Sequence, residues 1–129
     1  MIENIRIRNL RSIHDSGVIE FKPIMILLGA NSSGKSTFLR SFPLFTQSVD
    51  KKLRGPISWF DSAYVDYGDY KTAKNRYADE NEGISFEYTY CNLTSIDRRR
   101  FYVRQGNYVY STELKEGAFS FELKGDSKG

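Results

Sequence analysis

The 129-residue sequence is poor in the residues that build redox, metal and hydrolytic centres, because it contains one cysteine and one histidine. Cys91 has no second cysteine for an internal disulfide and no neighbouring cysteine or histidine for a metal site. His14 lacks the partner side chains of a general base, so we expect it to be a turn residue. These scarcities exclude an internal disulfide, give no support to a hydrolase triad, and favour a reducing, cytoplasmic environment.

Long apolar runs and a strong excess of one charge are also missing. No stretch reaches the roughly 20 apolar residues that cross a bilayer, and the amino terminus enters a predicted strand without a charged-then-apolar leader. We therefore expect a soluble, cytoplasmic protein of one domain, residues 1–129, with no membrane partner. The net charge of +3 and the pI near 9.0 are too mild to identify a nucleic-acid-binding protein by themselves.

One segment fits the phosphate-binding pattern G-x-x-x-x-G-K-[ST] at every specified position. Its residues are Gly29, Ala30, Asn31, Ser32, Ser33, Gly34, Lys35, Ser36 and Thr37. The segment follows an apolar run, residues 24–28, and precedes a predicted helix, which is the context that such a loop requires. Because the run shows no alternation, it predicts a central strand that is covered on both faces.

The residue types in this loop suit a nucleoside triphosphate. Gly29 and Gly34 lack a Cβ atom, so the backbone is able to wrap closely around a β-phosphate. Lys35 would place a positive charge between the β- and γ-phosphates. The Ser36 hydroxyl is the expected ligand for a bridging Mg²⁺ ion, and Thr37 is a weaker candidate for the α-phosphate. The loop therefore predicts binding of ATP with Mg²⁺.

Hydrolysis needs further groups that this sequence does not supply in a recognisable form. A metal-organising carboxylate usually ends an apolar strand, yet the nearest match, residues 119–122, alternates between apolar and polar side chains. Asp79 and Glu80 lie in a polar stretch that is typical of a solvated loop. We therefore expect the chain to bind ATP but to be catalytically incomplete alone, with its catalytic residues unassigned.

The predicted elements divide the chain into four parts. Residues 1–48 hold two antiparallel strands, the apolar strand and the P-loop helix; residues 49–83 form a connecting region, with a short helix possible near residues 70–77. Residues 84–124 alternate cleanly and predict four antiparallel strands, while residues 125–129 have no core residue and predict a disordered tail.

Two details of the first part follow from local pattern. Ile5 and Ile7 alternate with arginines, which predicts a half-buried first strand, and a turn at residues 14–17 returns the chain as the second strand.

The P-loop helix should pack through an apolar stripe of Phe38, Leu39 and Phe42. Pro43 should end or bend that helix near Phe42, because proline removes an amide donor.

Three features carry a family resemblance. Residues 5–12 have the form of an opening strand that ends in Asn, an apolar residue, Arg and Ser; residues 17–21 have the form of a second strand; and Asn31 lies within the P-loop. With these features the segment from Ile2 to Phe45 resembles the amino-terminal part of ABC-type ATPase heads in the SMC, RecF and OLD (overcoming-lysogenization-defect) group. Residues 54–60 and 64–70 are similar to a stretch of OLD-like, AAA-type ATPases of phage-defence systems.

The resemblance implies an α/β fold of the P-loop NTPase class, an ABC-ATPase-like first lobe with a mixed sheet around the P-loop helix and an antiparallel β-meander. In such proteins ATP binds between two heads, so the resemblance implies a homodimer of ATPase heads or a larger assembly. It also implies a nuclease or other effector, and DNA or RNA, as possible partners. The signature segment and switch histidine of these heads are not recognisable in the chain, which resembles only the first lobe and implies a truncated, split or partial protein.

The resemblance also assigns residues outside the loop. Arg11 and Ser12 match the arginine and serine that end the first strand and lie close to the phosphates in relatives, although an ordinary solvated turn would have the same sequence. Gln47 could be compared with a metal-contacting glutamine, but it lies too soon after the loop and at the far end of the helix.

A basic cluster in the last third of the chain is the candidate nucleic-acid site. Alternation places Arg98, Arg100, Tyr102 and Arg104 on one face of a predicted strand, where the arginines could follow a DNA or RNA backbone and Tyr102 could stack on a base. The alternative is a solvated outer face of the sheet.

Together these patterns favour the ATP-binding lobe of an SMC/OLD-like ATPase that acts on or near DNA, plausibly in phage defence, with head dimerisation gating an effector. One alternative is a RecF- or SMC-type ATPase of DNA repair or chromosome maintenance. The other is a non-catalytic nucleotide-sensing or assembly module that binds ATP without hydrolysing it.

Overall fold

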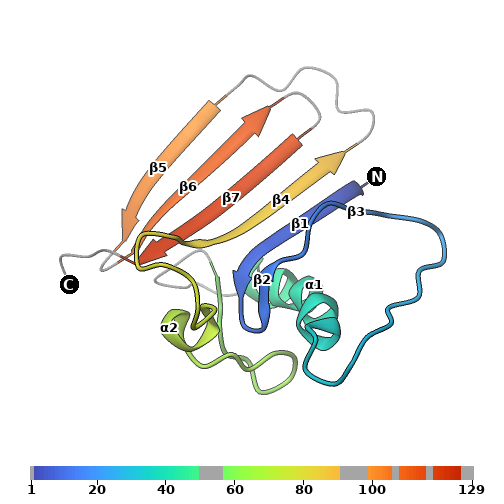
Figure 1. The fold of residues 1–129 in the computed structure, drawn as a ribbon. Coiled ribbons are helices and arrows are strands. Elements are labelled where there is room, and N and C mark those ends of the chain that lie inside the picture. The colour runs from blue at the N-terminus through green and yellow to red at the C-terminus, as the bar shows by residue number, and fades with distance from the viewer. Residues whose placement is uncertain (1, 50–56, 91–98, 106–107, 116–117, 126–129) are drawn as a thin grey trace.

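The computed structural model describes residues 2–49, 57–90, 99–105, 108–115 and 118–125 (Figure 1). Its strands are β1 (Ile2–Leu10), β2 (Ile13–Asp15), β3 (Ile19–Glu20), β4 (Ile84–Tyr90), β5 (Arg99–Gln105), β6 (Tyr108–Lys115) and β7 (Ala118–Gly125). Its helices are α1 (Lys35–Val49) and α2 (Tyr70–Ala73).

All the strands belong to one sheet with the order β2-β1-β4-β7-β6-β5, and β3 pairs with β1 beside β2. Every pairing among the described strands is antiparallel, so the prediction of a mixed sheet is wrong for this part of the chain. The prediction of an antiparallel β-meander holds for β5, β6 and β7, which pair in chain order, but not for β4, which lies beside β7. Since β5 begins well beyond the end of β4, no tight hairpin forces these two strands to pair.

The first strand has the alternation that its sequence predicts. Ile5 and Ile7 are buried, whereas Arg6 and Arg8 are half-buried on the other face. The turn after β1 differs from the prediction, because the chain reverses at residues 11–12 and Leu10 pairs with Ile13.

His14 therefore lies in β2 and not in a turn. The second strand predicted at residues 17–21 is reduced to β3, where Ile19 pairs with Ile5.

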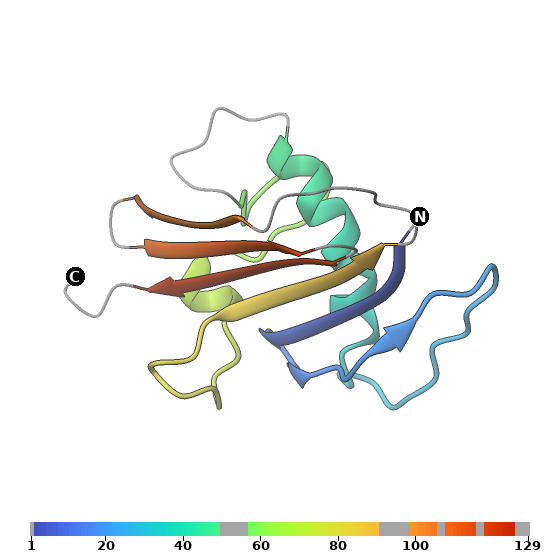
Figure 2. The ribbon, with the colours of Figure 1, turned by 90° about the horizontal axis from the view of Figure 1, so that it is seen from above.

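Helix α1 lies across one face of the sheet (Figure 2). The Phe45 ring meets the rings of Phe86 and Tyr88 on β4, with centroid distances of 4.8 and 5.8 Å. Phe38 and Leu44 are buried on the same side of the helix, but Leu39 is 57% exposed, so it does not belong to the predicted stripe. The packing face follows i, i+3 spacing through Phe38, Ser41, Leu44 and Gln47, all of which are buried.

Pro43 lies inside α1, and the helix continues to Val49. Of the two predicted outcomes, an end or a bend near Phe42, the first is therefore wrong. Proline removes an amide that would otherwise bond to the carbonyl of Leu39, so one rung of the helical ladder is lost next to an exposed residue. Packing of the following turns against the sheet holds the rest of the helix.

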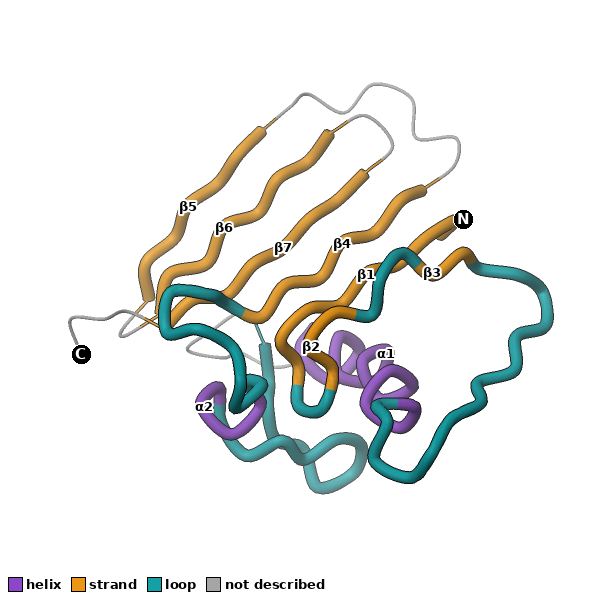
Figure 3. The backbone as a smooth tube through the Cα atoms, viewed as in Figure 1, coloured by secondary structure: helices purple, strands orange, loops and turns teal. Residues whose placement is uncertain are grey.

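The apolar run at residues 24–28 is not a strand in this structure, which corrects the prediction of a buried central strand. Ile24, Ile26 and Leu28 are 84%, 79% and 87% exposed, and Figure 3 shows the loop after β3 swinging away from the sheet before it reaches α1. The physical reason is that a strand needs a neighbour. Apolar, β-branched residues give the run its strand propensity, but no described strand pairs with it.

The connecting region packs tightly over residues 57–78, although its sequence has no clear period. Ile57, Val65, Tyr67, Tyr70 and Ala73 are all buried in the core. The helix that the sequence allows near residues 70–77 is present as the single turn of α2, which Asp69 caps by accepting a hydrogen bond from the Thr72 amide (2.7 Å).

Gln47 joins this region to α1. Its side-chain amide donates to the carbonyls of Ser58 and Val65, and its oxygen accepts from the Val65 amide at 3.0 Å. Because Gln47 is 3% exposed and turned into this network, it holds the connecting segment and does not face the P-loop.

The last third has four antiparallel strands, as the alternation predicts. The β4–β7 register pairs Phe86 with Phe121 and Ile84 with Leu123. Gly125 ends β7, so the predicted tail cannot begin there; residues 126–129 lie outside the described residues.

Candidate functional site

The residues of the phosphate-binding pattern form a loop that leads directly into α1. The Ser33 amide donates to the Ala30 carbonyl (3.2 Å), and the Phe38 amide donates to the Gly34 carbonyl (2.8 Å), which begins the helical ladder. Ser32 has a φ of 65°, so the loop turns sharply in its middle. This geometry brings the loop amides and the first amides of the helix to one place.

The two pattern glycines occupy positions where a side chain would collide with its neighbours. A Cβ at Gly29 would lie 2.7 Å from Ser33 Oγ, and one at Gly34 would lie 2.9 Å from Ile13 Cγ1. Gly34 also has a φ of +100°, a conformation that residues with side chains rarely adopt. The loop is therefore a narrow cradle of the kind that a phosphate group fits.

The Lys35 ammonium lies inside this cradle. Its Nζ donates hydrogen bonds to the carbonyls of Gly29 and Ala30, at 2.6 Å for Ala30, and lies 3.4 Å from Ser33 Oγ. The positive charge is thus held by neutral oxygens within the loop, in the position from which it would meet an anion.

Helix α1 suits an anion at its amino terminus, because its first turn contains no acidic residue. Ser36 is exposed at this end and Thr37 is half-buried. Within the described residues, no group of three His, Cys, Asp or Glu side chains could hold a metal by itself. Mg²⁺ binding here would therefore use the Ser36 hydroxyl together with phosphate oxygens and water, which is the usual coordination of this ion at nucleotides.

A cavity of about 530 Å³ lies between the P-loop and the hairpin that precedes it. One wall comes from Gly29, Ser33, Gly34 and Lys35, and the opposite wall from the residues 12–16 that run through β2. Apolar side chains complete it: Ile13, Ile19, Leu27, Leu28 and Phe38. The cavity joins a phosphate cradle to an apolar pocket, an arrangement that suits a ligand with both kinds of group.

The structure brings Ser12 to the loop, because its hydroxyl lies 3.4 Å from Thr37 Oγ1 and it lines the cavity. Arg11 does not line the cavity. Its guanidinium carbon lies 5.4 Å from the centroid of the Tyr67 ring, and its backbone has a φ of 52°. The Arg11 amide donates to the Ala73 carbonyl, and the Arg11 carbonyl accepts from Asn75 Nδ2, both at 2.7 Å.

Tyr67 connects Arg11 to the P-loop helix. Its hydroxyl donates a long hydrogen bond of 3.4 Å to the Thr37 carbonyl, and the residue is 3% exposed. Burial raises the pKa of the Tyr67 phenol, although the positive charges of Arg40 and Arg11 act in the opposite direction. The phenol therefore keeps its proton at neutral pH and remains a donor.

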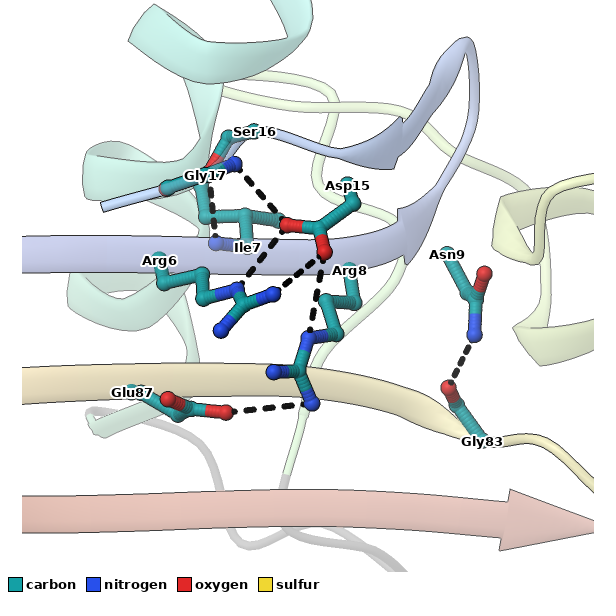
Figure 4. A network of polar contacts seen from close by, with 9 residues as sticks. All are labelled: Arg6, Ile7, Arg8, Asn9, Asp15, Ser16, Gly17, Gly83 and Glu87. Carbon is teal, nitrogen blue, oxygen red and sulfur yellow. Dashed lines mark hydrogen bonds and ion pairs between the residues drawn. The ribbon is translucent and has the colours of Figure 1, made fainter. Parts of the chain in front are cut away.

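An ion-pair network fixes the other side of the cavity (Figure 4). Arg6 holds Asp15 with two hydrogen bonds of 2.9 and 2.6 Å, Arg8 lies 3.5 Å from the same carboxylate, and Glu87 lies 3.3 Å from Arg8. The hydrogen bonds from Arg6 and from the Gly17 amide hold the pKa of Asp15 well below its usual range. Asp15 is thus a charged anchor of β2 and is already engaged by two arginines.

The other sequence-predicted residues lie away from this site or outside the described chain. Asp79 and Glu80 are exposed in a loop, as a solvated stretch should be. Arg98 and Cys91 fall in residues 91–98, which lie outside the described residues.

Three members of the basic cluster lie on β5, the edge strand. Arg100, Tyr102 and Arg104 occupy alternate positions that pair with Glu113, Ser111 and Val109 of β6. The strand therefore gives these three residues one face, but the register position opposite Arg100 belongs to an acidic residue.

Sequence reasoning missed three residues that organise the site: Asn9, Tyr67 and Asn75. The Asn9 carbonyl accepts from the Asn75 amide (2.9 Å), and Asn9 Nδ2 donates to the Gly83 carbonyl (3.0 Å). The one local signal was Asn9 itself, since asparagine tolerates the left-handed φ of 57° that it adopts at the end of β1. No local pattern marks Tyr67 or Asn75.

A family model described as AAA ATPase domain matches residues 1–127, a span that includes the cradle, the cavity and the β1–β2 turn. No curated protein and no solved structure gives a significant match. Neither α1 nor α2 has the length and apolar character of a membrane-spanning helix.

Proposed function

Because the chain belongs to the AAA ATPase domain family, we propose that it binds ATP with Mg²⁺ at residues 29–37. The observation that carries this proposal is the cradle, in which Gly29 and Gly34 stand where a Cβ would collide with Ser33 and Ile13. The cradle opens onto a helix terminus without an acidic residue, so a polyanion meets amide groups and a lysine and no negative charge from that turn.

In this proposal, different residues bind different parts of Mg-ATP. Lys35 exchanges its loop carbonyls for phosphate oxygens, Ser36 would hold the metal ion, and Ser12 lies within reach of the same end of the helix through Thr37. Bound Mg²⁺ would offset the charge of the phosphates. The base and ribose are placed in the adjoining cavity, whose apolar walls include Ile19 and Phe38.

At a finer level, we place the protein among cytoplasmic, SMC/OLD-like ATPases of phage defence, whose heads dimerise on ATP and gate an effector on or near DNA. Support comes from the sequence likeness of residues 2–45 to such heads and from the alternate arginines of β5. The alternative assignment, a RecF- or SMC-type ATPase of DNA repair or chromosome maintenance, is supported by the same sequence likeness. The DNA part of this proposal would be refuted if the protein did not bind duplex DNA, or if its affinity for DNA did not fall steeply with salt concentration.

Binding without turnover is a second candidate function, and one observation favours it. The carboxylate among the cavity-lining residues is Asp15, which Arg6 and Arg8 already engage. A carboxylate in that state is poorly placed to organise a metal-bound water. Purified chain that binds Mg-ATP but releases no phosphate, alone or with a partner, would favour this candidate over the ATPase.

Lys35→Ala is the test of the binding proposal. Hydrogen bonds to charged groups contribute about 1.5–3 kcal/mol each, so loss of the ammonium should weaken Mg-ATP binding by about 10- to 100-fold. The measurement is isothermal titration calorimetry, and the matched control is Lys71→Ala, because Lys71 is an exposed lysine of α2 that does not line the cavity.

The fold should survive both substitutions, since the contacts of Lys35 lie within the loop and not in the core. Unchanged ATP affinity in Lys35→Ala, with an unchanged circular dichroism spectrum, would refute the assignment of the loop. Equal weakening in the Lys71 control would mean that the effect is one of net charge.

A further inference from the structure

The cluster around Tyr67 is not explained by phosphate binding alone. Tyr67 lies in the connecting segment, yet it contacts the two parts of the chain that frame the nucleotide site: the β1–β2 turn through Arg11 and the P-loop helix through Thr37. We propose that Tyr67 is a positioning residue for nucleotide binding, whose ring holds the Arg11 guanidinium beside the first part of α1, outside the cavity wall, from where it turns toward a bound triphosphate. This inference rests on the proposed ATP-binding function.

The backbone of Arg11 is fixed more firmly than its side chain. Its amide and carbonyl are held by Ala73 and Asn75 at 2.7 Å, and the following residue, Ser12, lies against Thr37 of the P-loop helix. The guanidinium is exposed and forms no ion pair within the described residues. The Tyr67 ring, 5.4 Å away, is therefore the described group that orients it.

Orientation matters here because arginine has a long, flexible side chain. A guanidinium that is already held over a ring by a cation–π contact loses less conformational freedom when it meets an anion than one that moves freely in water. The contact with Tyr67 is a cation–π contact and not a hydrogen bond to an acceptor, so the ring does not compete with a phosphate for the N–H donors of Arg11.

The Tyr67 hydroxyl adds a second link, since it reaches the Thr37 carbonyl in the first part of α1. Because this hydrogen bond is long, at 3.4 Å, burial of the ring contributes more than the hydroxyl to holding it beside α1. Burial of the residue (3% exposed) prevents the ring from following Arg11 into solvent.

The test changes the electronic character of the ring without changing its shape. Tyr67 is replaced by phenylalanine and, in a second variant, by a trifluorinated phenylalanine whose ring face is far less negative and attracts a cation weakly. Removal of the ring is avoided, because a buried aromatic side chain contributes to the fold itself.

Affinity for Mg-ATP is then measured by calorimetry. We expect the phenylalanine variant to bind within about twofold of the wild type, and the trifluorinated variant to bind about three- to fivefold more weakly than the phenylalanine variant. In an Arg11→Ala background the two ring variants should bind equally, because the group that the ring orients is gone.

Tyr77 provides a matched control. The Arg76 guanidinium carbon lies over the Tyr77 ring at the same distance of 5.4 Å, but this pair is exposed and does not contact the P-loop. The same pair of substitutions at Tyr77 should leave ATP affinity unchanged.

Equal ATP affinity of the two ring variants would overturn the proposal, as would an effect of fluorination that persists in the Arg11→Ala background, since that pattern indicates a structural role. Failure of the ATP-binding function gives a different result, namely a Lys35→Ala variant that binds ATP as well as the wild type.

Discussion

Substitution of Gly34 by alanine should damage both the fold and the nucleotide site. A Cβ at this position would lie 2.9 Å from Ile13 Cγ1, closer than real Cβ contacts, and Ile13 is a buried residue that cannot move aside freely. Overpacking of this kind costs about 1–3 kcal/mol. The φ of +100° adds about 1–2 kcal/mol of backbone strain for a residue with a side chain. We therefore expect a destabilisation of about 2–5 kcal/mol.

Gly17→Ala separates the two contributions. Gly17 also has a positive φ, +64°, but a Cβ there would meet nothing within 4 Å. Its alanine variant should show the strain of about 1–2 kcal/mol alone, and the reduced freedom of the unfolded chain is common to both variants. The difference between the two variants is the expected cost of the collision with Ile13.

Urea unfolding followed by the fluorescence of the single tryptophan, Trp59, measures both free energies. In an Ile13→Ala background the Gly34→Ala substitution should cost only about as much as Gly17→Ala, because the colliding methylene is absent. Equal destabilisation by Gly34→Ala and Gly17→Ala in the wild-type background would refute the collision. Mg-ATP affinity should fall in Gly34→Ala and stay near the wild-type value in Gly17→Ala.

Two further outcomes are expected. Gln47→Leu should lower the free energy of unfolding by about 2–5 kcal/mol, because it leaves the Val65 amide and the carbonyls of Ser58 and Val65 buried without their side-chain partner. Urea unfolding measures this change. Unchanged stability together with a loss of Mg²⁺-dependent binding would instead favour a metal role for Gln47. Asp15→Asn should cost about 0.5–1 kcal/mol at pH 7, the value of a half-exposed ion pair. The folded-state pKa of Asp15 is depressed, so this stabilisation is present above the unfolded-state pKa of about 3.9. It is lost as the pH falls toward the folded-state pKa. The unfolding curves of the wild type and of Asp15→Asn should therefore converge in acid.

The part of the site that could be predicted from the sequence is the part that local pattern encodes. The glycines of the loop, Lys35 and the start of α1 lie within a few residues of one another, so a motif describes them completely. The alternation of β1 and of β4 to β7 likewise reports which positions share a face. These features depend on neighbours in the sequence, and the structure forms a loop before α1 and the strands β1 and β4 to β7 at these residues.

The features that could not be predicted depend on partners far along the chain. Residues 24–28 carry an apolar strand signal, but strand formation needs a paired neighbour that the pattern does not name. The order β4-β7-β6-β5 could not be predicted for the same reason, because all these strands show similar alternation and alternation does not identify the strand that pairs with each. Tyr67 and Asn75 reach the β1–β2 turn across a segment without periodicity, so their contacts leave no local trace.

The support of the phosphate cradle is therefore asymmetric. On its amino-terminal side the chain arrives through Ile24, Ile26 and Leu28, which are exposed and unpaired by any described strand. On its carboxyl-terminal side Gly34 rests against Ile13, and Thr37 meets both Ser12 and Tyr67.

A binding loop is only as ordered as the contacts that hold it. The β1–β2 turn and the connecting segment should therefore supply most of the order that the proposed phosphate binding requires. We therefore expect substitutions on that side to lower ATP affinity even where the substituted residue would touch no phosphate. The two most informative positions outside Lys35 are Gly34, whose neighbour in β2 is Ile13, and Tyr67, which contacts both Arg11 and Thr37.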